Sequence, residues 1–346
     1  MTAPADSPAP GVGRLHPARP TRRRAALVYN PIKVNAKELR TLVKKHSAAA
    51  GWGEPAFFET TVEDLGADVA RKALAEGADA VLVAGGDGTV RAVSEAMNGS
   101  GVPMTIVPSG TGNLLARNLN LPLDSAAKMV RATFDGDVHP VDIGIVRITR
   151  ANGSAEERAF VVMSGVGLDA AMIANTSAQL KKTVGWVAYV DGAARSLPFA
   201  KPFRAMYQLD GHRLHSTKAQ SVLFANCGSL PAGISLVPDA SIMDGKLDVC
   251  IIKPAGMFGW ARVWRRIWWE NSVMRRSRAG QRALARRPED ASVRYLRGVT
   301  VEVATNPPQA LQLDGDEFGE ATRVRCRIVE GGLLTVVPKG HTMHGI

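Results

Sequence analysis

The sequence VLVAGGDGT occupies residues 81–89, and MTIVPSGTGN occupies residues 104–113. In both, an apolar run typical of a buried strand leads into a glycine-rich turn and then into a helix-like stretch. Glycines in such a turn let backbone N–H groups approach an anion, and the N-terminus of the helix adds a favourable dipole. Two such turns on neighbouring strands predict a site that holds a polyphosphate, as a kinase requires.

Strand-like and helix-like stretches alternate around these two turns. The predicted strands before residue 138 cover residues 25–29, 56–59, 81–84 and 104–107. Apolar residues at helical spacing follow the first of them, including Leu39, Leu42 and Val43. This alternation predicts an α/β domain with a mainly parallel sheet that is covered on both faces. Ligands in such sheets bind beyond the carboxyl ends of the strands, which is where both turns fall.

The pattern changes after about residue 138, where extended segments begin to dominate. They cover residues 138–149, 159–163, 203–209, 221–225, 247–252, 299–303, 311–313, 324–329 and 333–337. Asp210-Gly211 lies between two of them and predicts a hairpin turn. We therefore expect a mainly antiparallel β-sandwich or barrel-like second domain. The chain then divides into an N-terminal extension (1–23), an α/β domain (24–140) and a second domain (141–324).

Composition narrows the class of protein. The chain has 346 residues, which suits two domains, and it has no run of 18 apolar residues that would span a membrane. Residues 1–23 are rich in Pro, Ala and Arg and lack an apolar signal core, so we expect a disordered extension. The cysteines match no zinc or redox spacing, which predicts reduced thiols in a cytoplasmic protein. They are Cys227, Cys250 and Cys326.

The net charge of +11 favours an acidic partner, although a solvated arginine-rich surface accounts for it equally well. No nucleic-acid-binding motif accompanies this charge, so we expect no nucleic-acid partner. The interval 256–297 holds four tryptophans among many arginines, such as Arg265 and Arg266. Aromatic rings beside arginines suit the surface of an anionic membrane. The favoured alternative is a surface helix whose tryptophans pack on the second domain.

Polar side chains follow the ends of the predicted strands. Asp87 is the one ionisable residue of the first turn, and a carboxylate there makes sense if it meets a metal ion or orients an acceptor hydroxyl. Asn30-Pro31 ends the first strand, and Thr60 or Thr61 ends the second. Each of these residues alone is more typical of a cap or turn. Their shared position at one edge of the sheet predicts contact with a nucleotide.

In order along the chain, these motifs resemble the diacylglycerol kinase catalytic family, which includes bacterial lipid kinases and sphingosine kinases. The resemblance rests on Asn30-Pro31, Gly85–Thr89, Pro108–Asn113, Gly165–Ala170, Asp239-Ala240, Asp244–Val249 and Asp314–Asp316. The set is highly specific, although NAD kinases and phosphofructokinases share the first turn. The resemblance implies a three-layer α/β domain and a β-sandwich with ATP in the cleft between them. It also allows residues 325–340 to return to the first domain.

The resemblance implies a role for individual residues, with ATP as co-substrate and Mg²⁺ as cation. Asp316 would be the general base, and Asp87 and Asp314 would support metal or acceptor geometry. Thr60 is preferred to Thr61 because it matches the family's spacing to the first turn. The residues expected to bind ATP are Asn30, Pro31, Thr60, Gly85, Gly86, Asp87, Gly88, Thr89, Gly110, Thr111 and Asn113. Those expected to hold a structural Mg²⁺ are Asp244 and the main-chain oxygens of Ser241 and Lys246.

The sequence departs from the family pattern near the predicted site. Arg91 and Ala92 stand where Asn and Glu are usual, so a polar contact to nucleotide is lost or Arg91 contacts phosphate instead. Leu114 stands where a further Asp is common. Asp316 replaces the usual glutamate base and is one methylene shorter. Glu317 remains the second candidate for the base, although strand alternation would point it to the opposite face.

These observations predict an ATP- and Mg²⁺-dependent lipid kinase that phosphorylates a hydroxyl of diacylglycerol or a related lipid. Acyl chains would lie in an apolar cleft of the second domain, and the enzyme would work in the cytoplasm or at the inner face of the membrane. One alternative is a soluble nucleotide kinase such as an NAD kinase. The other is a catalytically weak lipid-binding or regulatory protein, which the altered base motif suggests.

Overall fold

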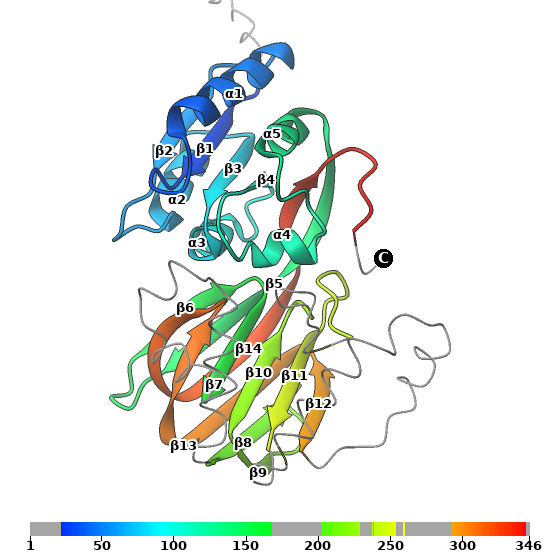
Figure 1. The fold of residues 1–346 in the computed structure, drawn as a ribbon. Helices are drawn as coiled ribbons and strands as arrows, with labels where there is room; N and C mark the ends of the chain where they lie inside the picture. The colour runs from blue at the N-terminus through cyan, green and yellow to red at the C-terminus, as the bar shows by residue number, and fades with distance from the viewer. Residues whose placement is uncertain are drawn as a thin grey trace, which may run out of the picture.

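Four short parallel strands form the sheet of the N-terminal domain, in the order β4-β3-β1-β2. They are β1 (Ala25–Tyr29), β2 (Ala56–Glu59), β3 (Ala80–Gly85) and β4 (Pro103–Pro108). Every residue of β1 and β3 is buried, because helices cover both faces of the sheet (Figure 1). This burial explains why both strands are continuous apolar runs without polar alternation. The computed structural model describes residues 22–167, 202–228, 237, 239–253, 259 and 292–343.

The helices of this domain pack as two pairs. On one side α1 (Ala36–Ala49) contacts α5 (Ala126–Asp135), and on the other α2 (Ala67–Ala75) contacts α3 (Asp87–Met97). A further short helix, α4 (Leu114–Asn118), follows the second glycine turn. The helix-like stretch predicted after this turn is thus present, whereas α5 was not predicted from the sequence. The Oγ of Ser125 accepts a hydrogen bond from the N–H of Lys128, so this N-cap was the signal that could have revealed α5.

Two long strands connect the domains. β5 (Asp137–Thr149) and β14 (Asp316–Val337) form an antiparallel pair whose register runs from Arg323–Thr149 to Val337–Asp137. The end of β14 also pairs in parallel with β4, placing Leu334 opposite Pro103. The last part of β14 therefore adds a strand to the N-terminal sheet, while its first part belongs to the second domain (Figure 1).

The second domain is a mainly antiparallel β-sandwich. One layer has the order β9-β8-β13-β14-β5-β6 and the other β12-β11-β10-β7-β13, so β13 contributes to both. Val146, Val222 and Phe224 are among the side chains that fill the core between the layers. The remaining strands are β6 (Ala155–Phe160), β7 (Met163–Gly167), β8 (Phe203–Leu209), β9 (His215–Ala219), β10 (Ser221–Ala225), β11 (Leu247–Ile252), β12 (Val293–Gly298) and β13 (Thr300–Leu313). The predicted fold class is therefore confirmed.

Two details of the predicted second domain are wrong. Residues 159–163 are not one strand, because β6 ends at Phe160 and β7 begins at Met163. The N–H groups in between turn towards the carboxylate of Asp314 instead of a neighbouring strand. The strands also resume at Val293, inside the interval assigned to the Trp- and Arg-rich insertion. The tryptophans and the arginines at 265–287 lie outside the described residues.

The cysteines behave as packed thiols. Cys227, Cys250 and Cys326 are all buried and free. Burial raises the pKa of Cys227 and of Cys326, which keeps both thiols protonated. Within the described residues, no helix is long and apolar enough to cross a membrane.

Candidate active site

The strand ends of the first domain form one row. Tyr29 lies opposite both Glu59 and Ala84, and β3 and β4 are in register up to Gly85 and Pro108. The residues that follow or end these strands are therefore neighbours along one edge of the sheet. In spatial order they are Thr60, Asn30, Gly85 and Pro108. Sequence reasoning placed all four at this edge.

The two glycine-rich turns touch each other. A Cβ on Gly110 would lie 3.0 Å from the Cα of Gly86, so any larger residue at position 110 would press the two turns apart. Gly86 is the N-cap residue of α3, and a Cβ placed on it would meet no atom within 4 Å. The space above Gly86 is therefore open, directly at the N-terminus of an eleven-residue helix. Backbone N–H groups at such a helix end are a favourable site for phosphate.

Asp87 connects the two turns. Its Oδ2 accepts a hydrogen bond of 3.1 Å from the N–H of Asn113, and its Oδ1 accepts one of 2.6 Å from the N–H of Leu114. These bonds satisfy the start of α4, as a capping carboxylate does. Burial, followed by the charge of Asp316, raises the pKa of Asp87. The carboxylate expected to meet a metal ion thus has a clear structural task at the contact between the turns.

The second turn is held closed by Asn113. This residue adopts a left-handed conformation with φ of 49°, which asparagine tolerates better than most residues. Its side-chain oxygen accepts from the N–H of Gly110 at 3.0 Å, and its amide donates to the Gly110 oxygen at 2.9 Å. Thr111 is exposed at the tip of the turn. Asn113 therefore shapes this turn, while Thr111 faces solvent where a ligand could reach it.

The predicted contacts on β1 and β2 differ in exposure. The Oδ1 of Asn30 accepts from the N–H of Ile32, which stabilises the turn containing exposed Pro31. Thr60 is buried, whereas Thr61 is exposed and accepts from the N–H of Asp64. A Cβ on Gly66 would lie 3.5 Å from Thr60 Cγ2 and 3.6 Å from Thr89 Cγ2, so both methyl groups face the same small space. This supports Thr60, not Thr61, as the residue next to the glycine turns.

Asp314 is a buried acceptor at the turn between β13 and β14. Its carboxylate accepts three backbone hydrogen bonds of 2.8–2.9 Å, from the N–H groups of Val161, Val162 and Met163. Its own backbone is left-handed, with φ of 50°. Burial raises the pKa of Asp314 to about 6, although these bonds and the charge of Arg91 oppose the rise. Asp314 therefore fixes the turn that carries Asp316.

Asp316 lies against the first glycine turn. A Cβ on Gly88 would be 2.9 Å from the Asp316 Oδ2, so only glycine lets the carboxylate approach so closely. The same oxygen is 3.7 Å from the Nη2 of Arg91, and the ring of Phe318 lies 4.8 Å from the Arg91 guanidinium carbon. Asp316 and Phe318 thus share one strand face, and the exposed Glu317 alternates to the other. This geometry favours Asp316 over Glu317 as the candidate base.

The segment predicted to hold a structural cation is tied to an arginine. Arg297 on β12 forms an ion pair with the Asp244 Oδ2 and donates a 2.7 Å hydrogen bond to the main-chain oxygen of Asp239. Its Nε lies 3.4 Å from the Asp248 Oδ1. The Asp244 Oδ1 accepts from the N–H of Lys246. A guanidinium therefore already supplies positive charge beside Asp244, and the segment does not fit a further cation without displacing Arg297.

Other features of this segment are structural. Ser241 Oγ accepts a long bond of 3.4 Å from the N–H of Met243. Asp142, which is buried, accepts from the N–H groups of Gly245 and Gly331 at 2.8 Å each. Across the described part of the chain, no group of three or more His, Cys, Asp or Glu side chains has the arrangement of a metal site. Sequence reasoning missed Arg297, because β12 is separated from this segment by the insertion.

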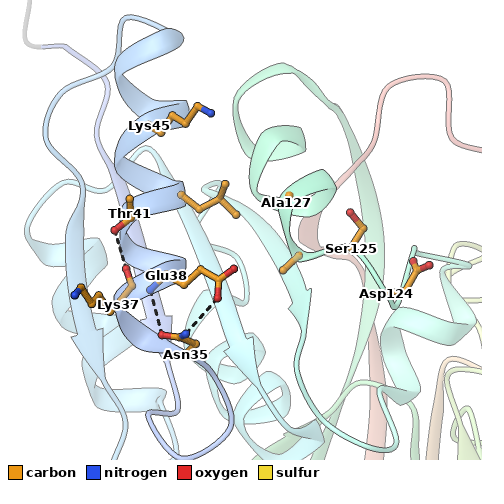
Figure 2. A pocket seen from close by; sticks show the side chains of 10 residues that line it. Asn35, Lys37, Glu38, Thr41, Lys45, Asp124, Ser125 and Ala127 are labelled. Carbon is orange, nitrogen blue, oxygen red and sulfur yellow. Dashed lines mark hydrogen bonds between the residues drawn. The ribbon is translucent and has the colours of Figure 1, made fainter.

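A hollow of about 700 Å³ opens between α1 and the start of α5 (Figure 2). Several of its polar groups already form hydrogen bonds at the start of α1, because Asn35 exchanges hydrogen bonds with Glu38 and Thr41 donates to the oxygen of Lys37. Among the described residues that line it, none was predicted to bind ATP or metal. The candidate active site is therefore the edge of the glycine turns with Asp316, not this hollow.

Comparison with known proteins identifies both halves of the chain. Residues 24–146 match the family model of the diacylglycerol kinase catalytic domain. Residues 160–338, more than half of the chain, match the YegS C-terminal NAD kinase beta sandwich-like domain. The solved structure of a diacylglycerol kinase from Bacillus anthracis str. Sterne has a similar fold, with a TM-score of 0.68 at 20% identity over 92% of this chain and 98% of that one. Yeast NADH kinase is a more distant fold neighbour, with a TM-score of 0.51 at 11% identity over 93% of this chain and 85% of that one.

Curated relatives agree with this assignment. A Bacillus subtilis (strain 168) protein named "Diacylglycerol kinase" is 26% identical over 305 residues, covering 86% of this chain and 91% of the relative. A Pseudomonas aeruginosa (strain UCBPP-PA14) protein named "Probable lipid kinase YegS-like" is 32% identical over 245 residues, covering 67% of this chain and 74% of the relative. The chain therefore belongs to the lipid kinase family that contains the diacylglycerol kinases and the YegS-like kinases.

Proposed function

We propose that this protein is an ATP-dependent kinase that phosphorylates the hydroxyl of diacylglycerol or of a closely related lipid. The observation that carries the proposal is the approach of Asp316 to Gly88 at the N-terminus of α3. It brings a half-buried carboxylate next to the turn best suited to hold phosphate. The names of the relatives point to the same acceptor class.

The reaction follows from this arrangement. The phosphates of ATP lie over Gly86, and backbone N–H groups of the two turns stabilise their negative charge. The acceptor hydroxyl gives its proton to the carboxylate of Asp316 while its oxygen forms a bond to the terminal phosphorus. The bond from that phosphorus to the bridging oxygen breaks, and ADP leaves. Most of the rate enhancement comes from positioning and charge stabilisation, as is usual for phosphoryl transfer.

Mg²⁺ is part of the proposal as the cation that accompanies ATP. Asp316 lies close enough to Asp87 for its charge to raise the pKa of Asp87. Two carboxylates this close to each other fit a divalent cation, so Asp316 would be the protein ligand nearest the phosphates. When bound, the cation neutralises charge on the transferring phosphoryl group.

The remaining ATP contacts are proposed from position along the sheet edge. Thr60 and Asn30 lie on the far side of Gly85 from the second turn, where the nucleoside would extend. Gly110, Thr111 and Asn113 would close over the phosphates from the other side, since Gly110 touches Gly86.

We also propose that the enzyme reaches its lipid by peripheral binding to an anionic membrane. Each basic residue near such a surface contributes about 1 kcal/mol, so several would concentrate the enzyme there. The candidates are four arginines of the insertion that lie outside the described residues: Arg265, Arg266, Arg275 and Arg276. Replacing all four with Ala should weaken salt-sensitive binding to phosphatidylserine vesicles and leave turnover of a dispersed short-chain lipid unchanged. Equal vesicle binding by both proteins would reject this surface.

The direct test is a panel of acceptors with labelled ATP. Diacylglycerol, monoacylglycerol, ceramide and sphingosine are presented in mixed micelles, and NAD⁺ is supplied in a parallel reaction. Labelled phosphatidic acid as the main product supports the proposal. Labelled NADP⁺ would indicate a nucleotide kinase, and ATP binding without lipid-dependent turnover would indicate a regulatory protein.

A further inference from the structure

Arg91 is a buried cation one helical turn into α3. Only 6% of the residue is exposed, and its Nε is buried without a hydrogen-bond partner in the described residues. The nearest carboxylate oxygens are Asp316 Oδ2 at 3.7 Å and Glu95 Oε2 at 3.9 Å, both beyond hydrogen-bond distance. Burying a charged N–H donor without a full set of partners destabilises the folded state. Such a cost suggests that the position of Arg91 serves the site rather than the core.

Three carboxylates interact with this cation, and two of them are held elsewhere. Asp314 accepts hydrogen bonds from three N–H groups at the loop between β6 and β7. Glu95 accepts a 2.8 Å hydrogen bond from the N–H of Ala159. Asp316 Oδ2 has no such bond, so it is the acceptor left for Arg91.

The side chains of Asp316 and Arg91 differ in solvent exposure. The side chain of Asp316 is 45% exposed and that of Arg91 only 7%, so the carboxylate lies towards solvent and the guanidinium behind it. The ring of Phe318 stacks over the guanidinium at 4.8 Å and limits its movement. Arg91 therefore reaches the open space above Gly86 less readily than Asp316 does, and direct contact with nucleotide is the less favoured role.

We infer that Arg91 is a positioning residue, which holds the Asp316 carboxylate against the first glycine turn from behind. This role rests on the proposed function, because it makes Asp316 the proton acceptor. It also accounts for the short side chain, since an arginine behind the carboxylate holds it forward against Gly88. Arg91 and Asp316 then work as one unit, although both depart from the usual family residues.

A double-mutant cycle in the full-length protein tests this unit. Arg91→Met keeps the length of the side chain under Phe318 and removes the charge. We expect kcat to fall about tenfold, a part of the usual contribution of a general base, with KM for ATP changed less than threefold. In an Asp316→Asn background, the same substitution should change kcat less than twofold. Arg91→Lys keeps the positive charge, so its kcat should be close to that of the parent. This variant replaces Arg91→Met in the cycle if Arg91→Met folds poorly.

Two kinetic outcomes would overturn the inference. Equal losses of kcat in both backgrounds would show that Arg91 does not act through Asp316. A large rise in KM for ATP at unchanged kcat would show that Arg91 binds the nucleotide itself. The matched control is Arg131→Met, which removes an exposed arginine of α5 that pairs with Asp135, and it should leave both constants unchanged.

A second readout does not require turnover. Melting temperatures of the same four proteins should be non-additive, so that Arg91→Met shifts the melting temperature less in the Asp316→Asn background. Additive shifts would show that the two side chains do not interact and would reject the inference. If the parent transfers phosphate to no acceptor in the panel, the proposed function fails, and the melting cycle alone still decides whether the pair exists.

Discussion

The Gly86→Val substitution should weaken phosphate binding and leave the free energy of unfolding nearly unchanged. Gly86 has φ of −84° and ψ of −178°, which valine adopts without strain, and a Cβ there would meet no atom within 4 Å. Valine is a poorer N-cap than glycine by up to about 1 kcal/mol. Replacing glycine also lowers the conformational entropy of the unfolded chain, which stabilises the folded state by about 0.4–1 kcal/mol. The free energy of unfolding should therefore change by less than about 1 kcal/mol.

Nucleotide binding should respond very differently. The isopropyl group would stand in the open space above the N-terminus of α3, where phosphate is expected. Excluding phosphate from two charge-assisted hydrogen bonds, each worth about 1.5–3 kcal/mol, should weaken ATP binding at least about 100-fold. Urea unfolding and titration calorimetry with ATP measure the two quantities on one preparation.

A neighbouring glycine supplies the matched control. A Cβ on Gly85 would lie 2.6 Å from the Cβ of Thr89, so Gly85→Val should destabilise the fold by about 1–3 kcal/mol. Gly86→Val is thus expected to stay folded and lose ATP binding, whereas Gly85→Val is expected to lose stability. Folded Gly86→Val protein that binds ATP as tightly as the parent would refute the placement of phosphate at this turn.

Three further predictions concern individual side chains. Asp316→Asn should lower turnover about 100-fold or more with ATP binding nearly unchanged, while Glu317→Gln, on the opposite strand face, should keep most activity; the reverse pattern in steady-state assays would reassign the base. Burial raises the pKa of Asp248 from its ordinary 3.8 to about 6, so its protonated form favours the folded state. Protonated Asp248 should add up to about 3 kcal/mol to the free energy of unfolding below about pH 4, and this contribution should be lost as the pH rises through about 6. Asp248→Asn should remove this part of the slope in urea unfolding, and an unchanged slope would contradict the assignment. Mg²⁺ should raise the melting temperature of the Arg297→Met variant, whereas the melting temperature of the parent should change with neither Mg²⁺ nor EDTA. A lower melting temperature of the parent in EDTA would show that a cation, not Arg297, holds the segment beside Asp244.

Local signals predicted the first domain well. The apolar runs of β3 and β4 and the turns after them are encoded within a few residues, because burial on both faces and glycine conformations leave a direct trace in sequence. The row of strand ends followed from the general geometry of parallel sheets. The preference for Thr60 over Thr61 came from family spacing, and burial of Thr60 supports it.

Long-range contacts were the part that the sequence did not reveal. Asp87 was expected at a metal or acceptor, yet its carboxylate bonds to backbone 26 and 27 residues away. The gap between β6 and β7 depends on Asp314, more than 150 residues further along the chain. The pairing of Arg91 with Asp316 likewise joins two domains. A pattern of residue types carries no information on which distant backbone a carboxylate will meet.

The crossing of β14 into the N-terminal sheet also matters for synthesis on the ribosome. β4 pairs with β3 on one side and with the end of β14 on the other, and the whole sandwich lies between them in sequence. Until that end emerges, the nascent N-terminal domain presents β4 as an open strand edge, which is prone to mispairing with other chains. The first domain to be translated is thus the last to be completed, and the order of folding runs against the usual N-to-C succession of domains.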